Sequence, residues 1–327
     1  DIALGEIVKL GSAFVTIVTT ALLVRKRGDF VAGALGLSIA VALLAVVALR
    51  VEAKAGVEAM EGANKNSYSM FALPAVLLAG YICLHMQNVP VIFKGVFVAC
   101  TLPTLAAIFM SGNRSGYLGA VIVGGMLFWG KRGRGMILVG FIGAAVAMWV
   151  IASGATKVFD ERMRQTIQGN ESDDYRIAIL TSCLHIGLEN PIIGISPQKI
   201  GFEIGRRTSV KHHYNVIDSH NVFAHVWAAS GLICFTAMIA VGWAMWTYKP
   251  RDGRPFAKKD PLRMAWSLLR ILVFLWVTRG LFTRDILYNP SFNICFGLSI
   301  GLCMLAETIR DRMAKAAPPA ISPPAIS

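Results

Sequence analysis

The sequence predicts an all-α, polytopic helical membrane protein with about nine visible spans and one large helical segment outside the membrane. The 327-residue chain is 55% hydrophobic and only 16% charged, whereas a soluble domain would carry roughly a quarter charged residues. Apolar runs of about 18 residues or more recur along the chain, and each is long enough to cross about 30 Å of hydrocarbon as a helix. The connecting segments alternate between basic and acidic or neutral composition.

Hydropathy places the spans one after another, with a short fifth span and one long gap after the sixth. The nine predicted spans cover residues 7–24, 30–49, 68–86, 91–110, 115–130, 136–153, 221–247, 264–282 and 290–307.

Charge predicts the orientation of these spans. Short basic loops stay in the cytoplasm, which places 25–29, 131–135, 249–263 and 310–315 inside and the long 154–219 segment outside, in the periplasm. The net charge of +13 follows mainly from this topology, and few aromatic residues accompany the basic clusters, so no nucleic-acid partner is indicated. The predicted organisation is therefore 1–153 membrane helices, 154–219 periplasmic helical segment, 220–309 membrane helices and 310–327 disordered cytoplasmic tail.

The six cysteines are dispersed, and none forms a C-x-x-C pair. The spacing therefore indicates neither a redox motif nor a thiolate metal site. We expect them to be small buried apolar residues.

The outer segment should contain two helices, at 158–168 and 173–189, followed by an ordered, turn-rich loop at 190–201. Residues 172–174 (Ser-Asp-Asp) are candidate amino-terminal caps of the second helix. Apolar residues recur along that helix at helical spacing, which predicts that it lies on the protein or at the membrane interface. These residues are Ile177, Leu180, Leu184 and Leu188.

Several arginines occur where a membrane makes a charge costly. Snorkelling to headgroups, or a salt bridge such as Arg284 with Asp285, would explain any one of them. Several arginines at one face with few acids nearby instead predict a bound anion, since guanidinium groups match phosphate geometry. The candidates are Arg114 between the fourth and fifth spans, Arg176 in the first turn of the outer helix, and Arg279 and Arg284 at the outer end of the eighth span, with Arg270 a further mid-span cation.

His220 begins the stretch "HNVFAHVWAASG". In a helix starting near Ser219, His220 would share one stripe with Ala224, Ala228 and Gly231, which would let a neighbouring helix approach closely. His225 would point elsewhere, so these two histidines do not have metal-chelating spacing. Three roles remain open for His220: a structural residue, a general base, or a ligand in a metal cluster with residues 212, 213 and 218.

Four motifs together resemble the O-antigen ligase/polymerase family of integral membrane glycosyltransferases. They are "SGNRSGYLGA", "DDYRIAIL", "ENPIIGISPQKIG" and "HNVFAHVWAASGLIC", the last similar to a His-[Asn/Ser/Gln]-x9-Gly-x-x-Gly signature with His220, Asn221 and Gly231. Cys234 stands where the second glycine is usual, which is expected to change the packing beneath the site. The resemblance covers roughly 90–305, and it implies twelve spans, so three more are expected before Asp1.

The resemblance implies an O-antigen ligase of the Gram-negative inner membrane, acting in lipopolysaccharide biosynthesis with its active site facing the periplasm. Its donor would be a polysaccharide on undecaprenyl diphosphate and its acceptor lipid A–core. The implied catalytic residues are His220 as general base, with Arg176 and Arg114 on the diphosphate. Arg279, Arg284 and Asn221 would be substrate-binding residues. An inverting reaction with no metal and no other cofactor is expected.

Three alternatives remain open at the level of the sequence. An O-antigen polymerase belongs to the same family and shares its motifs. A transporter or flippase for a lipid-linked anion would also use arginines around a cavity and a histidine proton relay. The third alternative is a membrane hydrolase with a histidine-based metal site.

Overall fold

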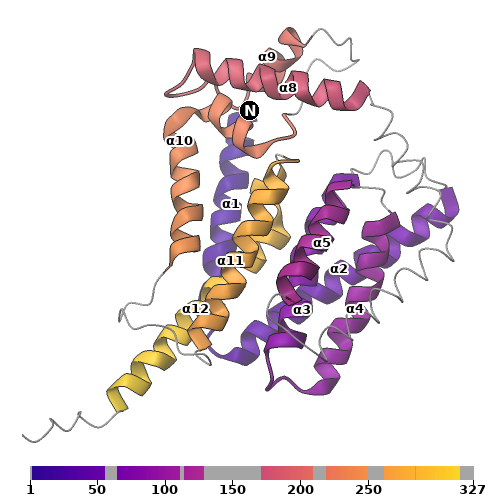
Figure 1. The fold of residues 1–327 in the computed structure, drawn as a ribbon, viewed down its shortest axis with the longest axis vertical. Helices are drawn as coiled ribbons and strands as arrows, with labels where there is room; N and C mark the ends of the chain where they lie inside the picture. The colour runs from indigo at the N-terminus through magenta and orange to yellow at the C-terminus, as the bar shows by residue number, and fades with distance from the viewer. Residues whose placement is uncertain are drawn as a thin grey trace, which may run out of the picture.

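A computed structural model describes residues 2–55, 65–110, 114–128, 171–208, 219–248, 261–283 and 285–316. Every regular element within these residues is a helix, in agreement with the predicted all-α class (Figure 1). The helices are α1 (Ile2–Leu23), α2 (Arg27–Ala55), α3 (Lys65–His85), α4 (Val91–Met110), α5 (Arg114–Phe128), α8 (Glu171–Glu189), α9 (Ile200–Arg207), α10 (Val222–Thr247), α11 (Pro261–Gly280), the 3₁₀ turn η2 (Asp285–Tyr288) and α12 (Pro290–Ala316).

Eight of the nine predicted spans coincide with these helices, and the remaining one, 136–153, lies outside the described residues. Five helices are long and apolar enough to cross a membrane: α2, α3, α4, α10 and α12. Helices α1 and α5 contribute shorter apolar stretches, Val8–Leu23 and Gly116–Leu127. Helix α11 is also 20 residues long but carries three arginines. The chain is a polytopic helical membrane protein.

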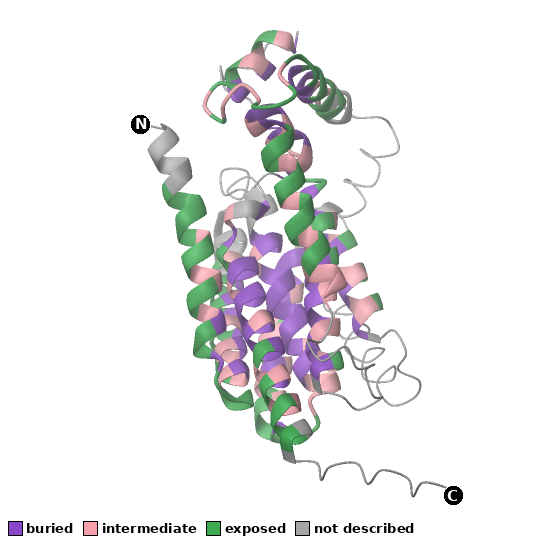
Figure 2. Cartoon of the chain, turned by 90° about the vertical axis from the view of Figure 1, so that its left-hand side faces the viewer, coloured by how far each residue is buried: buried purple, intermediate pink, exposed green. Residues whose placement is uncertain are grey.

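Helix α3 lies at the centre of the bundle, and its apolar residues form the middle of the main core. The outer helices instead expose large apolar side chains, including Phe14 on α1, Leu43 on α2 and Val91 on α4. Figure 2 shows this arrangement as buried helices surrounded by exposed ones. Exposed aliphatic surface along the outer helices suits contact with lipid chains, which are as apolar as leucine.

Helices α1 and α12 approach closely because α12 presents glycines four residues apart. A Cβ added to Gly297 would lie 2.6 Å from the carbonyl oxygen of Ile17, and one added to Gly301 would lie 2.6 Å from that of Ala21. Small residues at this spacing let two membrane helices bring their backbones together. The first described helix is thereby fixed against the last.

Arg270, which the sequence placed in the middle of a span, is held on α11 between two aromatic rings. Its guanidinium carbon lies 4.3 Å from the ring centroid of Trp246 on α10 and 4.5 Å from that of Trp266. A cation over an indole face is stabilised by the ring quadrupole, most strongly where water is excluded. Arg270 therefore joins α10 to α11, which explains a charge that the sequence alone left without a role.

Helices α8 and α9 lie across one end of the bundle, here named the cap end, above the start of α10 (Figure 1). They form a second small core with the first turns of α10, in which Ile179, Ile204 and Ala228 are fully buried. The guanidinium of Arg207 at the end of α9 donates to both carboxylate oxygens of Glu189 at the end of α8, at 2.8 and 2.5 Å. These bonds lower the pKa of the Glu189 carboxyl, so the two helix ends are paired at neutral pH.

One detail of the outer helix differs from the prediction. Helix α8 begins at Glu171, so the predicted caps at 172–174 lie inside its first turn and Arg176 lies in its second turn. The predicted apolar face was expected to meet either protein or the membrane interface; its residues, such as Leu184 and Leu188, are exposed, while Ile179 and Ile186 on another face are buried. The helix is apolar on two sides, and the side with the weaker sequence pattern packs on the protein. The predicted helix 158–168 and the tail 317–327 lie outside the described residues.

Candidate functional site

Helix α10 is broken at Gly231, nine residues after its first residue. Gly231 has φ 72° and ψ −175°, a conformation that a residue with a side chain rarely adopts. Such a break leaves backbone carbonyls of the preceding turn without their helical partners. The sequence predicted an unbroken helix here, so the break is a correction to that prediction.

The loop between α8 and α9 supplies the missing backbone partners. Ile195 and Ser196 donate their amide hydrogens to the carbonyls of Ala228 and Ala229 at 3.0 and 2.9 Å, and Leu232 donates to the carbonyl of Pro191 at 2.8 Å. Gly194, with φ 73°, allows this close approach. The motif "NPIIGIS" is thus the surface that covers the small residues of α10. The predicted neighbour was a helix; helix α8 does pack against Ala224 and Ala228, and this loop is a second neighbour that was not predicted.

Contact at Gly231 is closer than any side chain would permit. A Cβ there would lie 2.1 Å from the carbonyl oxygen of Ile192. Cys234, at the position of the second motif glycine, is exposed, so the packing beneath the site does not involve it. The first glycine of the motif is therefore required by the close backbone contact, whereas the second position, Cys234, is exposed.

His220 lies directly before α10 and not within it, which corrects the predicted helical stripe. The helix begins at Val222 with Asn221 as its amino-terminal cap. His220 has φ 50°, a left-handed conformation that few residues other than glycine, asparagine, aspartate and histidine adopt. Its side chain is half-buried, whereas His225, inside the helix, is buried. The two histidines therefore occupy different environments, as their spacing predicted.

Asn221 joins the start of α10 to the end of α11. Its Oδ1 accepts from the amide of Ala224 at 3.0 Å, and its Nδ2 donates to the carbonyl of Leu281 at 3.3 Å. Gly280 permits the contact, since a Cβ there would lie 2.6 Å from Cγ1 of Val222. The His220–Asn221 pair is thereby held against the turn that follows Arg279.

Arg279 is the largest fully buried side chain among the described residues, with 1% of its surface exposed. One terminal nitrogen donates to Oγ of Ser69 on α3 at 2.9 Å. Its Nε and its other terminal nitrogen have no hydrogen-bond partner among the described residues. A buried guanidinium with unused donors is costly, and an anion would satisfy it.

The first two turns of α5 lie beside Ser69 and the aliphatic part of the Arg279 side chain. A Cβ added to Gly116 would lie 3.0 Å from Cβ of Ser69, and one added to Gly119 would lie 3.6 Å from Cδ of Arg279. Arg114 is the first residue of α5, two positions before Gly116. The structure thus places the first two turns of α5 beside Ser69 and Arg279, and a helix amino terminus favours anions.

The other predicted site residues are placed differently. Arg176 is exposed on α8, which packs on α10 and α9 at the cap end. No contact recorded for the described residues joins Arg176 to His220 or Arg279. The side chain of Arg114 and all of Arg284 lie outside the described residues.

Two functional features were missed by the sequence analysis. Ser69, the partner of Arg279, stands in an apolar run with no motif around it, so no local signal pointed to it. The contact of 190–196 with α10 did have a sequence signal. The motifs that contain Gly194 and Gly231 both carry glycines, and a glycine that a motif requires often marks a place where two backbones approach closely. Among the described residues, no group of three or more His, Cys, Asp or Glu residues could hold a metal; most of the alternative cluster at 212–220 lies outside them.

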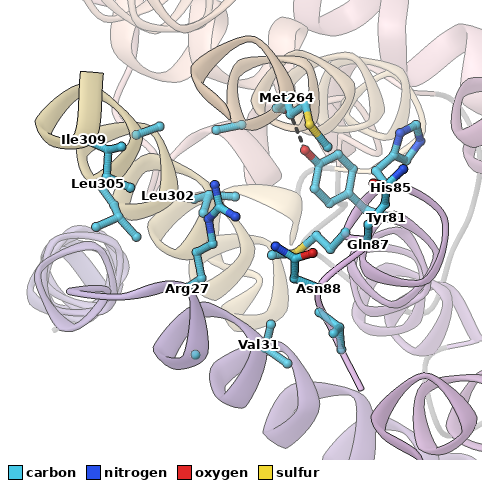
Figure 3. Close-up of a pocket in the computed structure, with 15 residues that line it drawn as sticks. Arg27, Val31, Tyr81, His85, Gln87, Asn88, Met264, Leu302, Leu305 and Ile309 are labelled. Atoms are coloured by element: carbon cyan, nitrogen blue, oxygen red, sulfur yellow. Dashed lines mark hydrogen bonds between the residues drawn. The ribbon is translucent and has the colours of Figure 1, made fainter. Parts of the chain in front are cut away.

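A cavity of about 580 Å³ lies among α2, α3, α11 and α12 (Figure 3), away from the cap end that α8 and α9 cover (Figure 1). It is lined by the start of α2, the end of α3, the start of α11 and the second half of α12, with Arg27, Met264 and Ile309 around it. The hydroxyl of Tyr81 donates to the carbonyl of Met264 at 2.6 Å beside it. The cavity contains none of the predicted site residues.

Comparison with known proteins gives one family match. Residues 99–239 match the family model described as O-antigen ligase. No curated protein matches the chain significantly. The matched region contains α5, the loop 190–196, His220, Asn221 and Gly231, and it ends within α10. The chain is thus a multi-pass bacterial membrane protein that is similar over residues 99–239 to the O-antigen ligase family.

Proposed function

We propose that this protein is an O-antigen ligase that transfers a polysaccharide from undecaprenyl diphosphate to lipid A–core at the periplasmic face of the inner membrane. The family match supports a membrane glycosyltransferase of this type. The observation that carries the proposal is His220, presented half-buried in a left-handed conformation and held through Asn221 to the end of α11. Unusual backbone conformations that the surroundings enforce are enriched at functional sites.

His220 acts as the general base in this proposal. It removes the proton from the acceptor hydroxyl while the hydroxyl oxygen attacks the anomeric carbon of the donor sugar. The bond between that carbon and the diphosphate oxygen breaks in the same step, so the configuration at the anomeric carbon inverts. The proton remains on the imidazole, and the negative charge leaves on undecaprenyl diphosphate.

Arg279, Arg176 and Arg114 bind the diphosphate in this proposal. Arg279 is supported by its unused donors and by the first two turns of α5 beside it. Arg176 would reach the anion from α8, and Arg284 from the turn after α11. Guanidinium groups stabilise the charge that develops on the leaving group.

The decisive variant is His220→Asn. Asparagine tolerates the left-handed backbone that His220 adopts, but it has no basic nitrogen, so a loss of rate reports chemistry and not strain. With purified protein, lipid-linked donor and lipid A–core, we expect the rate to fall by about 10²–10⁴-fold. The matched control His225→Ala should retain most activity at equal thermal stability. Wild-type rates for His220→Asn would exclude this base.

The acceptor that the reaction requires distinguishes a ligase from a polymerase. A ligase requires lipid A–core, whereas a polymerase extends lipid-linked donor with donor alone. Chain growth without lipid A–core would identify a polymerase, and donor translocation without any new glycosidic bond would identify a flippase. Activity that is lost with EDTA and restored by a metal would contradict the metal-independent mechanism.

A further inference from the structure

Helix α8 presents an apolar face that nothing in the described structure covers. We name it the α8 stripe. Its members are exposed although the opposite face of the same helix is buried against α9 and α10. Such a face is unfavourable in water. The α8 stripe consists of Ile177, Leu180, Leu184 and Leu188.

The loop that follows α8 exposes two further isoleucines. Ile192 and Ile193 are 62% and 77% exposed, although their backbone is packed tightly against Gly231. A surface loop usually carries polar side chains at such a tip. Here the loop is fixed by hydrogen bonds to α10 while its apolar side chains point away from the protein.

The depth of the 190–196 loop in the membrane follows from the length of α10. The far end of α10 carries Trp243, Trp246 and Tyr248, residue types that collect at a membrane–water boundary. Crossing about 30 Å of hydrocarbon takes about 20 helical residues. Counting back from Thr247 puts the boundary at the cap end near Ala228, the residue whose carbonyl the loop binds. Ile192 and Ile193, which contact Gly231, then lie about 4–5 Å inside the hydrocarbon.

Helix α8 lies at the same level as this boundary. A Cβ added to Gly187 would lie 2.9 Å from the indole of Trp227, one residue before Ala228. The helix runs across the end of α10 and not along it (Figure 1). Lying across a spanning helix at its boundary is the geometry of an interfacial helix.

We propose that the α8 stripe and the Ile192–Ile193 tip are a membrane-contact surface for the lipid leaflet at the cap end. Ile192 and Ile193 enter the acyl-chain region, and the α8 stripe lies at the level where chains meet headgroups. The irregular backbone of 190–196 is tolerated at this depth because its polar groups bond to the broken helix. This contact holds His220 and Asn221 close to the lipid surface. The membrane contact does not depend on whether the protein is a ligase.

Site-directed fluorescence tests this placement in the full chain. Single cysteines at Leu184 and Ile193, in a cysteine-free background, would carry an NBD label in phosphatidylcholine–phosphatidylglycerol vesicles. His185→Cys is the matched control, because His185 is exposed on the same helix but lies about 100° from Leu184. Ile233→Cys, on the exposed face of α10, is the control for a lipid-facing position. Its label also verifies that the cysteine-free protein has inserted into the vesicles.

We expect doxyl-labelled lipids to quench labels at 184, 193 and 233 at least about twofold more than the label at 185, and iodide to show the reverse order. Iodide quenching at 184 or 193 as strong as at 185 would overturn the proposal, because that position would then face water. Protection from both quenchers would overturn it as well. The surface would then be covered by another part of this chain or by a second copy.

Discussion

Asn221 Nδ2 donates to the carbonyl oxygen of Leu281, so one side chain ties the start of α10 to the turn after α11. The same side chain caps α10 through its Oδ1. His220 precedes this residue and Arg279 precedes Leu281 by two positions. The bond therefore holds the segment of the proposed base against the segment of a proposed diphosphate ligand, although Asn221 and Leu281 are 60 residues apart in the sequence.

Separate variants distinguish the two functions of Asn221. Asn221→Asp retains the capping oxygen and removes the donor to Leu281, while Asn221→Ala removes both. We expect Asn221→Ala to lower the free energy of unfolding by about 1 kcal/mol through loss of the cap, and Asn221→Asp to change it less. Both should lose activity, to a smaller extent than His220→Asn. Thermal unfolding and ligation rates measure the two effects, and full activity of Asn221→Asp would remove any role for the bond to Leu281.

Gly231→Ala should be strongly destabilising. Alanine at φ 72° is strained by about 1–3 kcal/mol, and its Cβ would meet the Ile192 carbonyl at 2.1 Å. The expected result is a large loss of folded protein in detergent, measured by size-exclusion chromatography and thermal unfolding. Gly242→Ala on the same helix is the control, because nothing lies within 4 Å of its Cβ position. Equal stability of the two variants would mean that α10 is not broken at Gly231.

Arg279→Met should lower the ligation activity without lowering the thermal stability. Methionine fills similar space without a buried charge, and replacing an uncompensated buried cation by an apolar residue is often neutral or stabilising. We expect thermal stability to be retained or raised, while ligation falls at least about 10-fold because the diphosphate loses a ligand. Arg263→Met is the control, since Arg263 is exposed near the opposite end of α11. Loss of folding together with normal specific activity would make Arg279 a structural anchor alone.

Labelling from outside the cell tests the orientation that the charges predict. A single cysteine at Gly169, in the predicted periplasmic segment, should react with a membrane-impermeant maleimide in intact spheroplasts. A cysteine at Lys258, in the predicted cytoplasmic loop, should react only after permeabilisation. The reverse pattern would invert the whole arrangement and place His220 in the cytoplasm.

The sequence alone determined the class of the fold and the position of its membrane helices. In hydrocarbon every backbone amide and carbonyl needs an internal partner, and a long apolar helix meets that requirement by itself. Length and apolarity were therefore sufficient to place α2, α3, α4, α10 and α12. The motifs around His220 and the loop 190–201 also identified the family, which the match over 99–239 supports.

Local periodicity could not determine which face of a helix is covered. On α8 the residues with the clearest helical spacing are exposed, because the start of α10 and helix α9 contact the opposite face. The sequence of α8 carries two apolar faces and no information on which of them meets protein.

Tertiary contact also decided the break in α10 and the surroundings of Arg279. The spacing of His220, Ala224, Ala228 and Gly231 fits a continuous helix, and only the loop at 190–196 supplies the hydrogen bonds that make a broken one stable. Likewise, Arg279 lies beside α5 and Ser69 because helices distant in sequence converge there. Sequence patterns report energies within one segment, whereas these features depend on partners that become neighbours only after the chain has folded.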